Sequence, residues 1–409
     1  MKKILFVSYD GLTDPLGQSQ IIPYLAGLTK YGYQFTILSC DKPDKYLLHK
    51  ERIENILRSY PIKWVSIPYH KNPPVLSSIY DTMMLKRKAR QLHQEDTFDM
   101  VHTRAGTPAI VGLWMKQKFG VKYLNDLRDF FADSRIDSGS WNLKNPVYRA
   151  VYRYLKNKES ESIKSNDGIV CLTHTAEKII REWPEYKKNI PLKVIPCSVD
   201  TELFNPKKID QDTKKKIREE LQIAEGDIII SYLGSIGGWY LTEEMMAFCK
   251  IISDENPGTR FLFITPHQHE IIFEMARKHS ISENKILVRH AQRDDVPILL
   301  SLSTYSIFFI KPCYSKQASS PTKHGEIMAM GIPLVTNKGV GDVAEIVQNY
   351  NSGIVLNNFE KESLAAAAKL LSKGIPFDPE RIRAGALEYY DLQNAIEKYK
   401  EIYLLILTE

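Results

Sequence analysis

The sequence predicts two α/β domains, each built on a parallel sheet wrapped by helices. Short β-branched and apolar runs alternate with longer segments of helical periodicity, which is the pattern of parallel sheets. The alternation stops once, at residues 197–208, and then starts again. The chain has 409 residues, a length that fits two domains of ordinary size.

The first domain is expected to cover residues 1–199. Its predicted strands are residues 3–8, 35–38, 63–67, 98–102, 121–126 and 168–173. A last apolar stretch at 192–196 leads into the segment CSVDTELFNPKK. This segment is rich in Pro, Asp and Asn and lacks helical periodicity, which indicates a linker.

The second domain is expected to cover residues 200–387. Its predicted strands are residues 227–234, 259–265, 285–290, 305–311 and 332–336. The final segment, ALEYYDLQNAIEKYKEIYLLIL, carries apolar residues at helical spacing. It is therefore predicted to be an amphipathic helix packed on another element.

The two halves of the chain differ in charge. Residues 1–199 carry 31 Lys and Arg against 20 Asp and Glu, a balance of +11, whereas residues 200–409 carry 24 against 29, a balance of −5. A basic half can face nucleic acid, anionic lipid or a phosphate-bearing substrate, or be only a solvated surface. No nucleic-acid-binding module accompanies the charge, so nucleic acid is the weaker reading.

The compartment is expected to be the cytoplasm. The five cysteines form no C-x-x-C pair, which favours buried thiols in a reducing environment. The N-terminal apolar stretch, residues 4–7, is far shorter than the core of a signal peptide. No apolar run approaches the roughly 20 residues needed to span a bilayer, so any membrane contact is expected to be peripheral.

The most informative motif is KQASSPTKHGEIMAMGIPLV, which follows the predicted strand 305–311. A helix is expected from about His324, and free backbone N–H groups at a helix start favour a bound phosphate. Lys323 adds a full positive charge. Glu326 lies one turn further and can accept hydrogen bonds from ribose hydroxyls, as carboxylates do in dinucleotide folds. The alternative is that Thr322 caps the helix and Glu326 favours its first turn.

In each domain, a glycine-containing loop follows the first predicted strand. The loop YLGSIGGWYL contains Gly237 and Gly238, and its backbone could approach a phosphate. Trp239 and Tyr240 could cover a sugar or anchor the following helix, and anchoring is the commoner role. The loop DGLTDPLGQ, with Gly17, could contact an anion or sugar, or be a plain β–α connection.

Charged residues gather after the fifth predicted strand, in LNDLRDFFADSRIDSG. The segment contains Asp126, Arg128, Asp129 and Asp133, and Arg104 lies at the end of the neighbouring predicted strand. Carboxylates in a cleft can act as general bases or hold sugar hydroxyls, and an arginine can bind phosphate. Alternatively, Asp126 and Arg128 could form an internal salt bridge that orders the loop.

No metal site is predicted. Asp210 and Asp212 have a metal-like spacing, but they precede a probable helix and are interpreted as caps. His267 and His269 lack the spacing of a metalloprotease pair and are interpreted as surface residues.

The segment NPVYRAVYRYLKNK interleaves apolar residues at spacing four with tyrosines and basic residues. It could lie in a lipid interface. An ordinary core-facing helix with a basic back is the other interpretation, and the more favoured one. Together with Lys86, Arg87, Lys88 and Arg90, this segment concentrates the positive excess of the first half.

The order of these motifs resembles family-four retaining glycosyltransferases of GT-B fold, specifically the bacterial surface-polysaccharide type. The resemblance covers nearly the whole chain, through GLTDPLGQSQ, DLRDFFADSR, VIPCSVDTELF, YLGSIGGWY, SSPTKHGEIMAMGIPLV and YYDLQNAIEKYKEIY. It implies two Rossmann-like domains facing across a cleft, with the helix at 388–409 returning to complete the first domain.

The resemblance also implies roles for individual residues. Glu326 would hold the nucleotide ribose, and Ser319, Ser320, Thr322 and Lys323 the donor diphosphate and sugar. Gly237 and Gly238 would complete the phosphate cradle, and His290 would lie by the base. Gly17 would sit beneath the transferred sugar. Asp126 and Arg128 would line the acceptor side; together with Lys323 they are the candidate catalytic residues.

The sequence departs from the family pattern at several positions. Many members carry a second carboxylate eight residues before the ribose carboxylate, where this chain has Ala318. Trp239 and Tyr240 replace a basic pair that often follows the glycine loop. Many relatives have a histidine in the region of Asn125. Family members often have Gly at the position of Asp129 and Glu at the position of Ser134.

The resemblance predicts transfer of a sugar from a nucleotide diphosphate sugar to a hydroxyl of a lipid-linked saccharide, with retention of configuration. It implies no cofactor and no metal, the nucleotide sugar being a co-substrate. The rivals are a nucleotide-sugar epimerase of the same fold and a non-catalytic partner that only binds nucleotide sugar, the latter made credible by Ala318.

Overall fold

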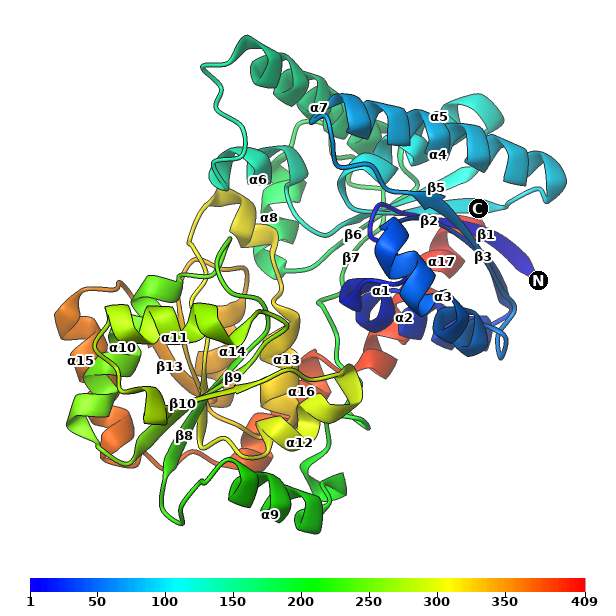
Figure 1. The fold of residues 1–409 in the computed structure, drawn as a ribbon. Helices are drawn as coiled ribbons and strands as arrows, with labels where there is room; N and C mark the ends of the chain where they lie inside the picture. Colours follow the sequence, from blue (N-terminus) through cyan, green and yellow to red (C-terminus); the bar gives the residue numbers. More distant parts are fainter. Residues whose placement is uncertain (409) are drawn as a thin grey trace. The chain divides into compact units, whose positions relative to one another are not determined.

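The computed structural model describes residues 1–408 and divides the chain into two compact units (Figure 1). Unit 1 comprises Met1–Cys197, Tyr314–Ser319 and the C-terminal segment from Leu392. Unit 2 comprises Ser198–Cys313 and Ser320–Asp391. The predicted boundaries lie at 199/200 and 387/388, and no sequence signal indicates that Tyr314–Ser319 belongs to unit 1.

Unit 1 is built on a seven-stranded parallel sheet. In spatial order its strands are β3 (Ile62–Pro68), β2 (Tyr33–Asp41), β1 (Lys2–Ser8), β4 (Met100–Arg104), β5 (Lys122–Leu127), β6 (Gly168–Cys171) and β7 (Leu192–Val194). The register sets Ser8 opposite Arg104, and Arg104 opposite Asp126. Because the strands are parallel, these polar residues meet at one edge, which is where open parallel sheets bind ligands.

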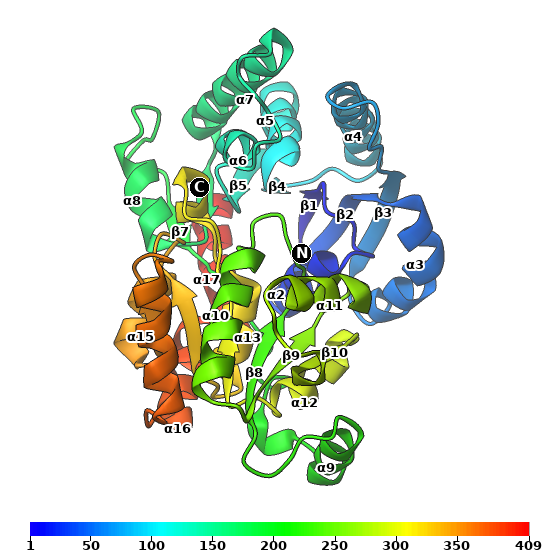
Figure 2. The ribbon, with the colours of Figure 1, turned by 60° about the vertical axis from the view of Figure 1, so that its left-hand side comes forward.

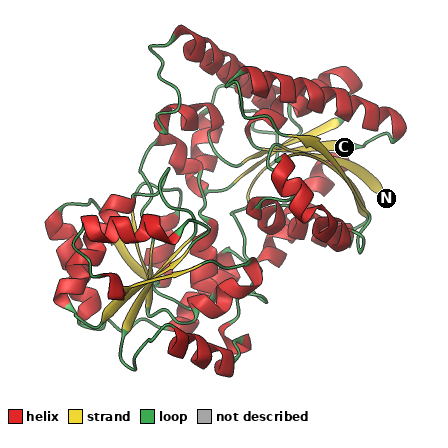
Figure 3. Cartoon of the chain, in the orientation of Figure 1, coloured by secondary structure: helices red, strands yellow, loops and turns green. Residues whose placement is uncertain are grey.

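The helices of unit 1 lie between its strands in the sequence, except for the last two, which come from later segments of the chain (Figure 3). They are α1 (Pro15–Gln20), α2 (Ile22–Thr29), α3 (Pro43–Leu57), α4 (Leu76–Glu95), α5 (Gly106–Phe119), α6 (Phe131–Asp137), α7 (Pro146–Ser165), α8 (His174–Glu182), the 3₁₀ turn η4 (Tyr314–Ala318) and α17 (Leu392–Leu407). Within residues 1–408, no helix is both long enough and apolar enough to cross a membrane.

Unit 2 is built on a six-stranded parallel sheet. Its order is β10 (Ile286–Arg289), β9 (Thr259–Ile264), β8 (Ile228–Leu233), β11 (Tyr305–Ile307), β12 (Leu334–Asn337) and β13 (Gly353–Leu356). Its helices are α9 (Gln211–Glu220), α10 (Thr242–Glu255), α11 (His269–Lys278), α12 (Val296–Leu300), α13 (Thr322–Ala329), α14 (Val343–Tyr350), α15 (Lys361–Ser372) and α16 (Pro379–Tyr389), with 3₁₀ turns η1 (Pro206–Lys208), η2 (Glu283–Lys285) and η3 (Arg293–Asp295).

The predicted fold class of two parallel α/β domains is confirmed, with differences in single elements. The strand predicted at 305–311 ends at Ile307. Beyond it, the Asn337 side chain takes the place of a ladder partner: its Oδ1 accepts from the Ile310 N–H and its Nδ2 donates to the Ile310 carbonyl, both at 2.9 Å. β13 was not among the predicted strands.

The interpretation of Asp210 as a helix cap is confirmed. Its carboxylate accepts a hydrogen bond from the backbone N–H of Thr213, at 3.0 Å, at the start of α9. Asp212 lies in the first turn of the same helix, where a negative charge is favourable.

The C-terminal helix α17 belongs to unit 1 and packs on α2 (Figure 1). It buries Ile396, Tyr399, Ile402 and Tyr403 of the predicted apolar face. The single helix predicted for this segment is wrong at its start, because residues up to Tyr389 belong to α16 of unit 2 and α17 begins only at Leu392. The helices α2 and α17 approach each other closely, since a Cβ on Gly27 of α2 would lie 2.2 Å from the Ile396 side chain of α17. The last residues of the chain therefore complete the core of unit 1.

We expect the Tyr399 hydroxyl to stabilise unit 1, because it donates a 2.8 Å hydrogen bond to the buried Asp126 carboxylate. Tyr399→Phe should lower the free energy of unfolding by about 1.5–3 kcal/mol, the usual cost of losing a hydrogen bond to a charge. Urea unfolding followed by tryptophan fluorescence measures this, because Trp64, Trp114, Trp141 and Trp183 all lie in unit 1.

Tyr60→Phe is the matched control, because Tyr60 is an exposed tyrosine of the same unit. Its removal should change the free energy by less than about 0.5 kcal/mol. Equal unfolding midpoints for the two variants would show that the Tyr399 hydroxyl contributes nothing to unit 1.

Candidate functional site

Lys323 lies in a buried aromatic cage within unit 2. It is the second residue of α13, and its side chain runs back toward the loop that follows β8. Its Nζ lies 3.7 Å from the centre of the Tyr240 ring and 4.3 Å from that of Tyr232, and it donates to the Tyr232 hydroxyl at 3.3 Å. Gly234 leaves room for it, because a Cβ there would come within 3.1 Å of Nζ.

The buried charge of Lys323 is not neutralised by a neighbouring carboxylate in the part of the chain that the structure describes. Among residues 1–408, no carboxylate makes an ion pair with its ammonium. Burial lowers the pKa of Lys323 to about 7, and the carboxylate of Glu326, one turn away, opposes this only in part. Cation–π contacts compensate some of the lost hydration. An ammonium in this position would gain strongly from an anion placed beside it.

Glu326 is nearly buried on the same helix and is held by Arg293. Its Oε1 accepts a hydrogen bond from Arg293 Nη1 at 2.8 Å. The guanidinium of Arg293 in turn lies 5.3 Å from the centre of the Phe204 ring. Arg293 begins η3, in the loop after β10, so this loop fixes the orientation of the carboxylate.

The other residues predicted to bind the donor are divided between the two units. Thr322 is the first residue of α13, and the cap position is Pro321, so Thr322 is not the cap of the alternative reading. Gly237 and Gly238 have left-handed φ angles, in the loop after β8. Ser320 belongs to unit 2, whereas Ser319 belongs to unit 1. His290 is exposed directly after β10.

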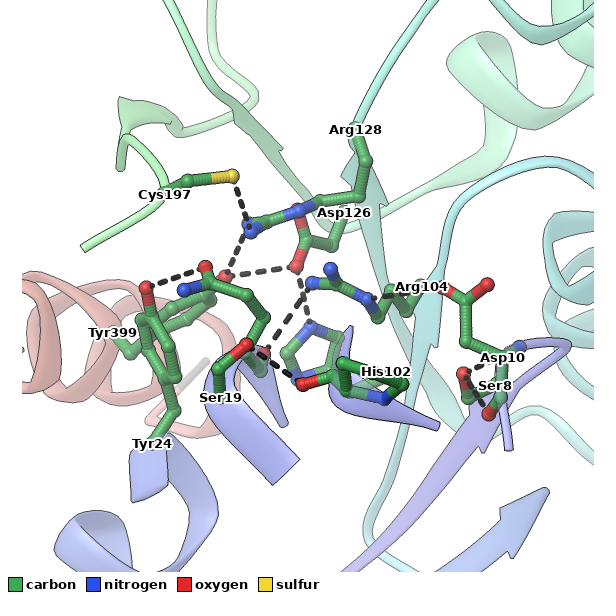
Figure 4. Close-up of polar contacts among 12 residues, drawn as sticks. Ser8, Asp10, Ser19, Tyr24, His102, Arg104, Asp126, Arg128, Cys197 and Tyr399 are labelled. Atoms are coloured by element: carbon green, nitrogen blue, oxygen red, sulfur yellow. Dashed lines mark hydrogen bonds and ion pairs between the residues drawn. The ribbon is translucent and has the colours of Figure 1, made fainter. Parts of the chain in front are cut away.

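A buried charge network occupies the carboxyl edge of the unit 1 sheet (Figure 4). Asp126, near the end of β5, accepts from the Tyr399 hydroxyl at 2.8 Å and from Arg128 Nη1 at 3.4 Å. Burial opposes the charge, but the neighbouring Arg128 guanidinium and His102 hold the pKa of Asp126 well below its usual range. Arg128 also donates to the Cys197 sulfur at 3.5 Å.

His102 and Arg104 extend the network along β4. His102 Nε2 lies 3.5 Å from Asp126 Oδ2, and its Nδ1 is hydrogen-bonded to the Tyr403 hydroxyl at 2.7 Å. Burial lowers the pKa of His102, which favours the neutral ring. Arg104 is buried, with its Nε 3.6 Å from the half-exposed carboxylate of Asp10 (Figure 4).

The remaining acceptor-side candidates lie in a different place. Asp133, on α6, accepts from the Tyr152 hydroxyl at 2.9 Å and from Lys156 Nζ at 3.0 Å, so it ties α6 to α7. Asp129 lines a cavity of about 40 Å³ shared with Asn125, α5, α6 and α7. Burial raises the pKa of Asp129. The structure thus separates Asp129 and Asp133 from the Asp126 network.

The packing of the loop before α1 is sufficient to require a glycine at position 17. A Cβ there would lie 2.3 Å from the carbonyl oxygen of Gly11 and 2.5 Å from the Cα of Leu12. Both neighbours are backbone atoms of the same loop and cannot move aside cheaply. The glycine therefore lets α1 pack against its own leading turn, whatever else it contacts.

Sequence reasoning missed the residues that hold the predicted ones in place. They are Tyr232, Arg293, His102, Tyr399 and Tyr403. His102 and Tyr232 lie in strands that the sequence predicted, and there they read as core positions. Tyr399 was predicted to be on an apolar face, but no sequence signal shows that its hydroxyl meets Asp126.

Two family models match the chain, one in each half. The model described as Glycosyltransferase Family 4 matches residues 23–203, and the model described as Glycosyl transferases group 1 matches residues 213–385. A search of curated proteins found no significant match.

Solved structures of similar fold cover almost the whole chain. A glycosyltransferase from Rickettsia africae has a TM-score of 0.71 at 16% identity, covering 100% of this chain and 99% of its own. Anabaena HepE in complex with UDP-glucose has a TM-score of 0.72 at 14% identity, covering 98% and 99%. WaaG, a glycosyltransferase of lipopolysaccharide biosynthesis, has a TM-score of 0.68 at 13% identity, covering 98% and 99%.

These similarities agree with the two parallel sheets and with the polar residues gathered at their carboxyl edges. The matched residues include Asp126 in one domain and Lys323 and Glu326 in the other. A Glycosyltransferase Family 4 domain followed by a Glycosyl transferases group 1 domain, on a GT-B fold, supports a glycosyltransferase of the family 4 type.

Proposed function

We propose that the protein transfers a sugar from a nucleoside diphosphate sugar to a hydroxyl of a lipid-linked saccharide, with retention of anomeric configuration. The observation that carries the proposal is the start of α13, where one helical turn presents both Lys323 and Glu326. The first offers a buried positive charge for the diphosphate, and the second offers a carboxylate for ribose hydroxyls.

The proposed step is a front-face displacement. The acceptor oxygen bonds to the anomeric carbon on the face from which the diphosphate departs. The bond from that carbon to the phosphate oxygen breaks, and the departing phosphate takes the acceptor proton. Lys323 and the first N–H groups of α13 stabilise the negative charge that grows on the diphosphate. No metal ion is needed in this scheme, because the protein supplies that charge.

Unit 1 is proposed to supply the acceptor side. Asp126 and Arg128 are bound to each other and buried, so they fit a role in holding the sheet edge rather than one of free acid or base. Arg104, Asp129 and Asp133 are the further candidates on this side. A lipid-linked acceptor would bring the enzyme to the cytoplasmic face of a membrane, where the basic first half would favour anionic lipid.

The nucleotide to test first is UDP, because the similar HepE structure contains UDP-glucose. Thermal shifts with UDP, GDP and ADP would rank the bases, since a ligand of the native state raises stability by mass action. Incubation with donor alone distinguishes the rivals. An epimerase would interconvert the donor sugar without acceptor, and a binding partner would bind donor but transfer nothing to any acceptor.

Glu326→Ala should weaken binding of the preferred nucleotide about 10- to 100-fold, because a hydrogen bond to a charged group is worth about 1.5–3 kcal/mol. The loss should be much smaller for the 2′,3′-dideoxy nucleotide, which lacks the hydroxyls that the carboxylate would accept. Isothermal titration calorimetry with both nucleotides measures the difference.

Glu345→Ala is the control for this measurement, because Glu345 is an exposed carboxylate in the first turn of α14. Its removal should leave both affinities unchanged. If Glu326→Ala weakens binding of the nucleotide and of its 2′,3′-dideoxy analogue equally, the carboxylate does not bind the ribose.

Lys323 should make donor binding depend on pH. Its pKa of about 7 in the free protein means that the ammonium loses its proton as pH rises through this value. Affinity for a nucleotide sugar, whose diphosphate does not titrate in this range, should therefore fall from pH 6 to pH 9, by up to about tenfold per pH unit above the pKa. Calorimetry in buffers of different ionisation enthalpy should show proton uptake on binding above pH 7.

Two variants separate this effect from a general pH response. Lys323→Met should bind weakly and with a flatter pH profile. Lys338→Met, which removes an exposed lysine after β12, should keep the wild-type profile. A wild-type affinity that is constant between pH 6 and pH 9 would contradict the assignment of Lys323.

A further inference from the structure

The helix α4 of unit 1 carries an apolar stripe that its own domain leaves uncovered. The α4 stripe consists of Leu76, Ile79, Tyr80 and Met83, whose exposed fractions lie between 47% and 64%. The spacing of three, four and seven residues places them on one side of the helix. The other side is buried through Asp81, Leu85, Ala89 and Leu92, so α4 is firmly attached to unit 1.

Basic residues continue the same face of α4. Arg87 and Arg90 follow the stripe at helical spacing and are exposed. Neither makes an ion pair with a carboxylate within residues 1–408. Lys71 is exposed in the loop just before the helix. Contiguous exposed apolar residues bordered by basic ones mark an interaction surface rather than ordinary scatter.

The neighbouring helix α7 has a similar composition in its first half. α5 packs between α4 and α7, so the three helices form one layer of unit 1 (Figure 2). α7 exposes Val147 and Tyr154, with Arg149 and Arg153 in the same stretch. The lysines of α7 contribute less to the positive charge of this surface, because Lys156 pairs with Asp133 and Glu159, and Lys158 pairs with Glu161.

We infer that the α4 stripe is the surface by which the protein docks on an anionic lipid membrane. The apolar side chains would enter the boundary between headgroups and acyl chains, and Arg87 and Arg90 would lie at the headgroups. The inference rests on the proposed lipid-linked acceptor, and it places the contact on α4 rather than on the basic back of α7 alone.

Charge favours a membrane over a second copy of the chain. A twofold dimer through this face would set α4 of one protomer against α4 of its partner. The arginines of the two helices, and the two halves with a formal charge of +11, would then repel each other. An anionic bilayer complements both the apolar stripe and the positive charge.

The test is sedimentation with two kinds of vesicle, one of phosphatidylcholine alone and one of phosphatidylcholine mixed with phosphatidylglycerol. The wild-type protein should bind the mixed vesicles and bind the neutral ones weakly. Ile79→Ser with Met83→Ser should lower the partition coefficient on mixed vesicles by about tenfold or more. Arg87→Gln with Arg90→Gln should reduce the preference for anionic vesicles and its sensitivity to salt.

The matched control is Leu47→Ser with Leu48→Ser, because these residues of α3 are 84% and 72% exposed in the same unit. This variant should sediment like the wild type. All variants change exposed side chains, so unfolding midpoints should stay unchanged and show that the fold is intact. Binding of the α4 variant at the wild-type level, or an equal loss in the α3 variant, would overturn the inference.

Light scattering of the protein in solution tests whether a second copy of the chain, rather than a membrane, covers the α4 stripe. A wild-type dimer that the stripe variant converts to a monomer would assign the stripe to a second copy and overturn the membrane inference. Donor binding and transfer to a soluble saccharide should not depend on α4. Absence of transfer with intact vesicle binding would therefore reject the proposed function alone, and intact transfer with no vesicle binding would reject this inference alone.

Discussion

The structure of unit 1 depends on one buried carboxylate, that of Asp126. A charge without water is costly, and here Arg128, the Tyr399 hydroxyl and the nearby His102 provide what water would have provided. Tyr399 comes from the last helix of the chain, so the carboxylate can be satisfied only when α17 is in place. One part of the carboxyl edge of the sheet is thereby held by α17.

Unit 2 contains the opposite case, a buried cation that makes no ion pair with any carboxylate of residues 1–408. Lys323 is surrounded by two tyrosine rings, which attract its charge but do not neutralise it. Glu326 is close in sequence, yet its oxygen is held by Arg293. The positive charge is thus kept apart from the negative one within a single helical turn. In the proposed function, this separation would let one helix start bind both an anionic diphosphate and a neutral, hydroxyl-bearing ribose.

Much of this architecture follows from local sequence signals. The strands of both sheets stand out because buried parallel strands are short, apolar and β-branched. The start of α13 was predicted at about His324, two residues late, because the sequence pattern places Thr322 and Lys323 before the helix that they begin. The partners of Lys323 could not be predicted. Tyr232 is separated from Lys323 by 91 residues, and its place in an apolar strand indicates only that it is buried in the core. The hydrogen bond between Tyr399 and Asp126 joins residues 273 apart, and no periodic pattern encodes such a pairing.

The residue at position 318 shows how a departure from a family pattern can have a packing origin. Many family members have a carboxylate here, but Ala318 is buried in an apolar cluster of unit 1 with Leu127 and Phe130. The η4 turn around it is held to unit 1 in three ways: Tyr314 stacks on Phe130, Thr173 donates to the Gln317 carbonyl, and Asp137 accepts from the Ser315 N–H. A carboxylate in this cluster would lose its hydration without gaining a cation. Alanine at 318 therefore belongs with the apolar docking of η4, and the charge chemistry of the loop is left to Lys323 and Glu326.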